Sequence, residues 1–417
     1  MAGALSATLF LGLTLASEDA RQSSPADLCG ACKTTGRVAN PWFAPRAEAE
    51  AQSRFCSAFF EGDKAGRGAE FLPCPKCRRA DLKEAAEREL AATRLERERW
   101  LAERRAVDLQ LSTRLVWVES DHFVVGFEAP RYRTRGRRDL DGHAAAHLFA
   151  RRLEGMYADF EKLFSIDDSR MRNRRHHVLI FERLKNMAKA SEVLLAMASD
   201  TAAKLAGDPS ILVTWTDRAS LPDDLAMDRH VTHHVTHLLE SVFHLKEWLY
   251  SQGFLDEGLA HCFEMRYFLA ADNSCNQEER EEDFGGQNWP RDVLLAVQAG
   301  KNPSLAELCA KRTDQLRGSD HSFAWSVADW LITIDAKRVA ELMVKLKEKV
   351  ELREALRAVY GKSFFELERD WKAYVLESYP ARARPAPAGA AVELPADLLR
   401  GSPDRPVTSG ASGADRR

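Results

Sequence analysis

Two histidines spaced four residues apart, His233 and His237, form a pattern that could bind a metal ion. In a helix, side chains at positions i and i+4 project from successive turns on one face, so both imidazoles can reach one cation. At about 100° per residue, one side of this helix carries a row of histidines and another side carries aliphatic residues. The histidine row consists of His230, His233, His237 and His244. The sequence therefore predicts a two-sided helix with its apolar side in the core.

A carboxylate, Glu257, could complete this metal site. It lies twenty residues after His237, at the start of a second helical pattern. Catalytic zinc is often bound by two histidines and one glutamate, with a fourth position left for water. We therefore predict that Zn²⁺ binds to His233, His237 and Glu257.

The chain resembles the gluzincin metallopeptidases (peptidase MA-like), whose members carry His-Glu-x-x-His followed by Trp-Leu-x-Glu-Gly-Leu-Ala. The matching residues are His233, His237 and the segment 254–260. Three further segments, 118–130, 323–332 and 361–379, resemble the opening strand, a downstream helix and the closing helix of the family. The resemblance covers residues 114–380. It implies an α+β zincin fold with an N-terminal sheet and a mainly helical C-terminal part.

One position departs from the family pattern, because His234 stands where the family has its general-base glutamate. In the family this glutamate takes a proton from the zinc-bound water. A neutral imidazole can transfer protons near neutral pH, but a nearby zinc ion disfavours imidazolium. Alternatively, His234 or His230 joins the metal and closes its open position. We expect a zinc-binding pseudopeptidase; the alternative is an active hydrolase that uses His234 or another base.

Three other residues are candidates for supporting roles. The resemblance implies a hydrogen-bond donor near the start of a later helix that stabilises the oxyanion, and His321 fits this position. An exposed histidine at a helix start is the alternative for His321. Glu240 and Glu264 could orient metal-bound imidazoles, although each could equally be an ordinary helix-surface glutamate.

Four cysteines near the N-terminus form two Cys-x-x-Cys pairs. They are Cys29, Cys32, Cys74 and Cys77. Two such pairs can hold one tetrahedral zinc, although the 41 residues between them exceed the spacing in a compact ribbon. Disulfides, which an exported chain permits, are the alternative. We predict a zinc-ribbon-like module over residues 17–80 with a second Zn²⁺. Cys56 is expected to be an odd thiol in this module, and Cys262, Cys275 and Cys309 to be buried or incidental in the larger domain.

Composition and charge narrow the classes of protein. The chain has 417 residues, 45% of them hydrophobic, and a formal net charge of −3, which gives no global field that would favour nucleic acid. An apolar run over residues 4–16 predicts a signal peptide and hence export, although no Lys or Arg precedes it. No later segment reaches the roughly 20 apolar residues of a membrane-spanning helix.

We divide the chain into a signal peptide (1–16), the Cys module (17–80), a charged helix (81–110), the gluzincin-like domain (111–380) and a disordered tail (381–417).

Hydrophobic periodicity predicts the elements that must position these residues. Strands rich in β-branched and aromatic residues are expected over 114–127, 176–181 and 211–215. Helices are expected over 143–164, 188–205, 224–250, 255–270, 323–334, 339–350 and 364–378. This order, with strands first and helices later, predicts an α+β domain.

These expectations lead to two classes of function. In the first, a peptide or protein ligand binds in the cleft of a zinc domain that no longer cuts it. In the second, the Cys module does the work and the larger domain is a scaffold for protein interaction. The sequence defines neither the substrate nor the oligomeric state.

Overall fold

A computed structural model of the chain describes residues 29–40, 54–58, 71–134, 138–166, 175–207, 209–216, 221–240, 243, 252–271, 275 and 288–383. Contacts divide the chain into two compact units. The smaller unit comprises residues 1–43 and 64–98, and the larger comprises residues 44–63 and 99–417.

The smaller unit contains a short two-stranded sheet and the first part of a long helix. Strand β1 (Arg37–Ala39) pairs antiparallel with β3 (Phe71–Pro73), and α3 (Ala80–Leu111) begins directly after the second Cys-x-x-Cys pair. Gly36 has a φ of +73°, and a Cβ there would lie 2.6 Å from the Leu82 carbonyl oxygen. Only glycine fits this close turn, which brings the strand against the helix.

The larger unit is built on a six-stranded mixed sheet with strand order β2-β4-β5-β8-β10-β9. The strands are β2 (Phe55–Cys56), β4 (Val116–Glu119), β5 (Phe123–Phe127), β8 (His176–Phe181), β9 (Ala202–Leu205) and β10 (Ser210–Trp215). The three central strands β5, β8 and β10 are parallel, and the pairings β2–β4, β4–β5 and β9–β10 are antiparallel. A separate hairpin pairs β6 (Arg131–Arg133) with β7 (Asp139–Asp141).

Side chains alternate between the two faces of this sheet and build two cores. On β8, Val178 and Ile180 belong to the core that also contains α4, whereas Leu179 and Phe181 belong to the core on the other face. This second core is closed by α5 and by the C-terminal part of α3, which contributes Trp100. Because helices cover both faces of the sheet, both sets of side chains on the central strands are buried and their sequences are largely apolar.

Helices α4 (Gly142–Phe164), α5 (Leu184–Leu195) and α6 (Asp224–Leu239) pack on the sheet. The carboxylate of Asp223 accepts a hydrogen bond from the Ala226 amide and so fixes the start of α6. At Asp224, the first residue of α6, the guanidinium of Arg152 on α4 donates two hydrogen bonds to the carboxylate, at 2.8 and 2.9 Å. This buried pair locks α6 against α4.

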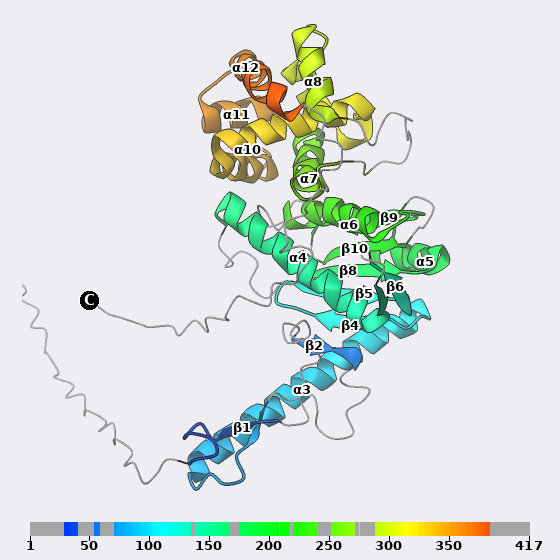
Figure 1. The fold of residues 1–417 in the computed structure, drawn as a ribbon, viewed down its shortest axis with the longest axis vertical. Coiled ribbons are helices and arrows are strands. Elements are labelled where there is room, and N and C mark those ends of the chain that lie inside the picture. The colour runs from blue at the N-terminus through cyan, green and yellow to red at the C-terminus, as the bar shows by residue number, and fades with distance from the viewer. Residues whose placement is uncertain are drawn as a thin grey trace, which may run out of the picture. The chain divides into compact units, whose positions relative to one another are not determined.

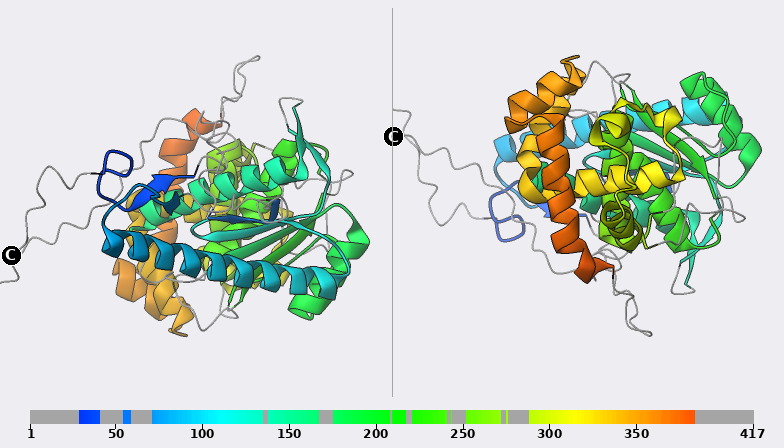
Figure 2. Two further views of the ribbon diagram at one scale, coloured as in Figure 1. Left: turned by 90° about the horizontal axis from the view of Figure 1, so that it is seen from below. Right: turned by 90° about the horizontal axis from the view of Figure 1, so that it is seen from above.

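The rest of the larger unit is helical. It contains α7 (Gly253–Phe268), α8 (Trp289–Gln298), α9 (Leu305–Ala310), a short 3₁₀ turn (Thr313–Gln315), α10 (Gly318–Lys347), α11 (Leu352–Tyr360) and α12 (Phe364–Arg382). Figure 1 shows α6 between the sheet and α7, with α8 and α10 on the far side of α7. Figure 2 shows α10, α11 and α12 grouped together. The metal-site candidates on α6 and α7 therefore lie where the sheet meets the helical part.

A glycine permits the close contact between α7 and α10. A Cβ on Gly258 would lie 2.6 Å from the carbonyl oxygen of Ala324, a separation that real Cβ atoms do not show. The glycine directly follows Glu257, so the close approach of the two helices brings this carboxylate next to the start of α10. The close packing of α7 against α10 therefore explains why a glycine follows Glu257 in the sequence.

The α+β class is confirmed, and several predicted bounds are wrong. The helix expected over 188–205 ends at Leu195, where Ala196 adopts a left-handed conformation, and the chain then forms β9 at the sheet edge. The helices expected over 323–334 and 339–350 form one long element, α10, that is broken at Asp335, whose side chain accepts from the amide of Lys337.

Some sequence predictions fall on residues that the structure does not describe. These are the signal peptide (1–16), residues 384–417 of the tail, and residues 244–251, which include His244 and the last part of the helix expected over 224–250. The described helix in that segment, α6, ends at Leu239. Among the described residues, no helix is long and apolar enough to cross a membrane.

Candidate metal centre

Four potential ligands from three segments meet in the larger unit. His233 and His237 come from α6, Glu257 from the first turns of α7, and Cys275 from the chain that follows α7. One ligand atom from each lies within 4.8 Å of all the others. The two histidines and Glu257 are at most 4% exposed, and Cys275 is half-buried. The three ligands predicted from the sequence are therefore brought together, and a fourth joins them.

The separations between these atoms fit one tetrahedral ion. The Nε2 atoms of His233 and His237 are 3.4 Å apart, and the Cys275 sulfur lies 3.4 and 3.1 Å from them. The Glu257 oxygens lie 3.5 Å from Nε2 of His233 and 3.7 Å from Nε2 of His237. Tetrahedral zinc, with bonds of about 2.0–2.3 Å, separates its ligand atoms by about 3.3–3.6 Å. Zinc therefore fits this group with small adjustments.

The carboxylate of Glu257 supports the same conclusion. It is completely buried, and neither of its oxygens has a hydrogen-bond partner. A buried carboxylate without hydrogen bonds is costly unless a cation compensates it. The arrangement is therefore one that a metal ion would complete.

A second carboxylate orients His233. Oε2 of Glu264 lies 3.2 Å from Nδ1 of His233 and 2.7 Å from Nδ1 of His261. When Nδ1 of His233 donates to Glu264, its Nε2 lone pair points to the metal group, as in carboxylate–histidine–metal triads. The supporting role considered for Glu264 is consistent with this geometry.

His234 faces a lysine and is not one of the four potential ligands. Its Nδ1 lies 3.5 Å from Nζ of Lys204 on β9, and the same Nζ donates to the Cys275 sulfur at 2.6 Å. His230 is turned to the sheet, with Nε2 2.9 Å from the Thr214 hydroxyl. Neither belongs to the group of four, in which Cys275 is the fourth potential ligand.

Opposite charges in this centre shift each other's ionisation. Burial opposes the charged forms, yet the Cys275 sulfur and Glu264 hold the pKa of His233 well above its ordinary value. The pKa of Glu257 is well below its ordinary value, despite burial, because of His233 and His237. Burial and Glu257 oppose the thiolate, but His237, Lys204 and His233 lower the pKa of Cys275 to about 7. Protons and a metal ion compete for these imidazoles, so acid should release the metal.

Burial, followed by electrostatic interaction with His230 and Lys204, lowers the pKa of His234 well below its ordinary value. The imidazole at the base position is thus held neutral.

His321 and Glu240 also lie beside the centre. His321, at the start of α10, is buried, so the alternative of an exposed helix-start histidine is wrong. Its Nδ1 lies 3.0 Å from Nε2 of His261 and 3.7 Å from Oε2 of Glu257. Glu240 is buried with its carboxylate 4.0 Å from Nδ1 of His237, and burial raises the pKa of Glu240 well above its usual range.

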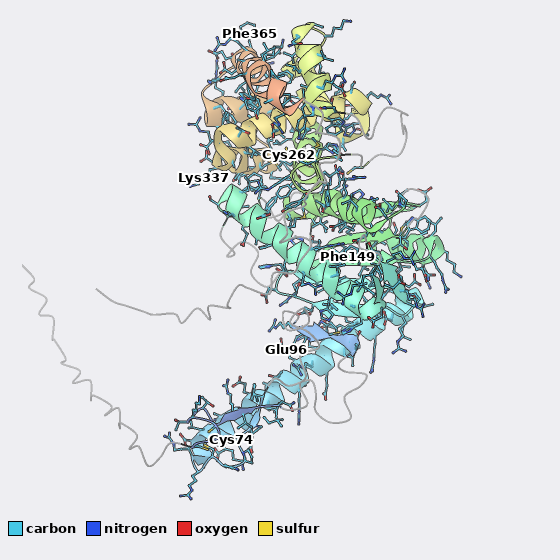
Figure 3. The ribbon with its side chains drawn as sticks, viewed as in Figure 1. Cys74, Glu96, Phe149, Cys262, Lys337 and Phe365 are labelled. Atoms are coloured by element: carbon cyan, nitrogen blue, oxygen red, sulfur yellow. The ribbon has the colours of Figure 1, made fainter. Side chains whose placement is uncertain are left out.

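Cys275 was not identified as a ligand from the sequence. It follows Glu257 by eighteen residues and belongs to no recognisable motif. The other two cysteines expected in the larger domain, Cys262 and Cys309, do not belong to the group of four. Cys309 is buried, and the sulfur of Cys262 on α7 (Figure 3) lies 3.8 Å from the Trp325 carbonyl oxygen. Only the fold distinguishes Cys275 from them.

The smaller unit gathers the cysteines of the two Cys-x-x-Cys pairs. The sulfurs of Cys29 and Cys74 are 3.8 Å apart, and Cys74 is labelled in Figure 3. Burial opposes ionisation of Cys32, but the Gly36 backbone and the thiols of Cys29, Cys74 and Cys77 lower its pKa to about 7. All eight cysteines are unbridged. The 3.8 Å separation is far beyond a disulfide bond of about 2.05 Å and matches the sulfur–sulfur edge of about 3.8 Å around tetrahedral zinc.

Cys56 belongs to the larger unit and not to the Cys module. It forms part of β2, which pairs with β4 at the edge of the main sheet.

Comparison with protein-family models gave no match, and no curated protein matched the chain.

Proposed function

We propose that the larger unit is a zinc-binding, metallopeptidase-like domain whose metal has a closed set of four ligands and which does not hydrolyse peptides efficiently. The observation that carries the proposal is the convergence of His233, His237, Glu257 and Cys275 at tetrahedral spacing. Glu257 and a Cys275 thiolate supply two negative charges, which neutralise Zn²⁺ in a buried site. The gluzincin family remains part of this proposal on the resemblance of the sequence.

Two features oppose catalysis. With an open coordination position, zinc would supply an activated water, but Cys275 stands at the fourth position. The residue at the base position, His234, faces the cation of Lys204, 3.5 Å away. A group beside a lysine ammonium is poorly suited to accept and hold a proton. The domain therefore combines a suitable ligand set with an unsuitable base.

A peptide or protein ligand is the partner that we propose for this domain, on the basis of the resemblance. Export of the chain, and a second zinc at the Cys module, are parts of the same proposal. The sulfur spacing in the module supports the second zinc.

Zinc content tests the metal site. Purified full-length protein should contain two zinc ions per chain. The His233→Ala/His237→Ala variant should lose one, and the Cys29→Ser/Cys32→Ser variant should lose the other. His122→Ala, which removes a histidine bonded to Glu154, is the control and should retain both. Equal zinc content in the wild type and the His233→Ala/His237→Ala variant would refute the site.

Peptidase assays test the loss of catalysis. The wild type should leave a quenched peptide library uncut. Combining His234→Glu with Cys275→Ala restores the base and opens the fourth position, so this double variant should gain zinc-dependent activity over either single variant. Zinc-dependent cleavage by the wild type that is lost in His234→Ala would instead establish the active hydrolase.

A further inference from the structure

A second group of metal-ligating side chains lies in the larger unit, away from the residues of the first centre. It consists of Cys56 on β2 and of His143 and His147 on α4. All three are buried, with exposures of 1%, 8% and 2%. Their ligand atoms lie within 4.8 Å of one another. The group contains no residue used by the proposed zinc centre.

The fold fixes the position of each member. β2 pairs with β4 so that Cys56 lies opposite Val118 on the sheet edge. The α4 helix starts at Gly142, where the Asp141 carboxylate accepts from the Ala144 amide, and this start places His143 and His147 on successive turns of one face. A Cβ on Gly142 would lie 2.5 Å from the Ala129 carbonyl oxygen, so the start of α4 is held tightly against the preceding chain.

One ring nitrogen, Nε2 of His143, faces both of the other potential ligand atoms at hydrogen-bonding distance. Nε2 of His143 lies 2.8 Å from the Cys56 sulfur and 3.0 Å from Nε2 of His147. One ring nitrogen carries either a single proton or a single lone pair, so it can form one good hydrogen bond and not two. A cation at the common point would be approached by all three atoms through their lone pairs.

Ligand type, number and charge select the cation. One sulfur and two imidazole nitrogens suit copper and zinc, and thiolate favours the softer ion, Cu⁺. A thiolate and two neutral imidazoles balance one positive charge, whereas Zn²⁺ would leave a net charge of +1 in a buried, largely apolar place. A net buried charge is costly. Arg151, whose charge acts on His147, adds to this cost.

From these contacts we propose that Cys56, His143 and His147 form a buried three-coordinate site for Cu⁺. The site is independent of the zinc centre and of any peptidase-like function. Loading requires these atoms, now 2.8 and 3.0 Å apart, to separate by about 0.5–0.9 Å, because three trigonal bonds as long as zinc–nitrogen and zinc–sulfur bonds, about 2.0–2.3 Å, place ligand atoms about 3.5–3.7 Å apart.

Copper titration with matched variants tests this site. Full-length protein is titrated anaerobically with Cu⁺ in the presence of a chromophoric Cu⁺ chelator, and the equivalents taken by the protein are counted. Cys56→Ala and His147→Gln should each bind one equivalent fewer than the wild type. Cys309→Ala removes another buried thiol and should bind as many as the wild type. Thermal melting checks that each variant is folded; Cys56→Ala is the safer of the two, because a buried cysteine behaves as a small apolar residue.

Two results would overturn the proposal. The first is equal Cu⁺ uptake by folded Cys56→Ala and the wild type. The second is loss of one Zn²⁺ equivalent, with unchanged Cu⁺ uptake, which would show that the site prefers a divalent ion. Because the His233→Ala/His237→Ala variant keeps all three residues, it should show the same Cys56-dependent uptake, so failure of this proposal is distinguishable from failure of the zinc centre.

Discussion

The two histidine pairs of the larger unit have the same spacing but different surroundings. His233 and His237 on α6 and His143 and His147 on α4 are both four residues apart and buried, and each pair meets a cysteine from a distant segment. The α6 pair also meets carboxylates, since Glu257 and Glu264 lie within 3.5 Å of His233, whereas the potential ligand group around the α4 pair, within the described residues, contains none. Helical spacing thus brings imidazoles together, whereas the acidic partners decide which charge the pair can hold. The α6 pair suits a divalent ion, and the α4 pair suits a monovalent one.

The largest expected difference between the two histidine pairs is in the stability lost when one imidazole of each pair is replaced. In metal-depleted protein, His233→Gln removes the one imidazole that faces both buried carboxylates, Glu257 and Glu264, and should lower the free energy of unfolding by about 3–5 kcal/mol. His147→Gln changes a potential ligand group, Cys56, His143 and His147, that contains no carboxylate, and should cost about 1 kcal/mol. Urea unfolding of both variants measures the difference. Similar costs would show that the carboxylates do not distinguish the two pairs.

Zinc should stabilise the α6 centre. The Cys29→Ser/Cys32→Ser background lacks two zinc ligands of the Cys module and so leaves the α6 centre as the zinc site to be measured. In this background, zinc at a thousand times its dissociation constant should add about 4 kcal/mol to the unfolding free energy. The further variant His237→Gln should show little of this gain. Identical melting of the background protein with zinc and with chelator would contradict the α6 site.

Loss of the orienting carboxylate should weaken zinc binding without abolishing it. Glu264→Gln should reduce zinc affinity by about 10–100-fold, because His233 loses the acceptor that fixes its ring. Glu341→Gln, on an exposed position of α10, is the control. Competition with a zinc chelator measures both affinities. Equal values would show that Glu264 does not support zinc binding by His233.

The glycine after Glu257 should matter through packing. Gly258→Ala places a Cβ against the Ala324 carbonyl and should destabilise the protein by about 1–3 kcal/mol. Gly155→Ala, in α4 with nothing within 4 Å of its Cβ, should instead stabilise by about 0.4–1 kcal/mol. Thermal melting compares them. A neutral Gly258→Ala would mean that α7 and α10 have room to move apart.

The sequence predicted elements whose patterns are local. The predicted bounds of β8 match the structure, and α4 and α12 differ by a few residues, because their periodicity and caps lie within the segments themselves. The helix expected over 188–205 was wrong because β9 is formed by pairing with β10, which no local pattern records.

The candidate sites show the same limit. His233, His237 and Glu257 were found because a short spacing and a nearby helix start are visible in sequence. The pair His143 and His147 carries the same four-residue spacing and could have been found by it. Cys275 and Cys56 could not, because only the folded chain brings each sulfur next to its histidines.

The cobalt spectrum tests most directly whether Cys275 closes the α6 centre. Full-length protein carrying Cys29→Ser, Cys32→Ser and Cys56→Ala should bind one Co²⁺ and show both a thiolate-to-cobalt charge-transfer band and the intense visible bands of tetrahedral Co²⁺. Adding Cys275→Ser should remove the charge-transfer band while Co²⁺ stays bound to His233, His237 and Glu257. A spectrum that is unchanged by Cys275→Ser would contradict the closed four-ligand centre.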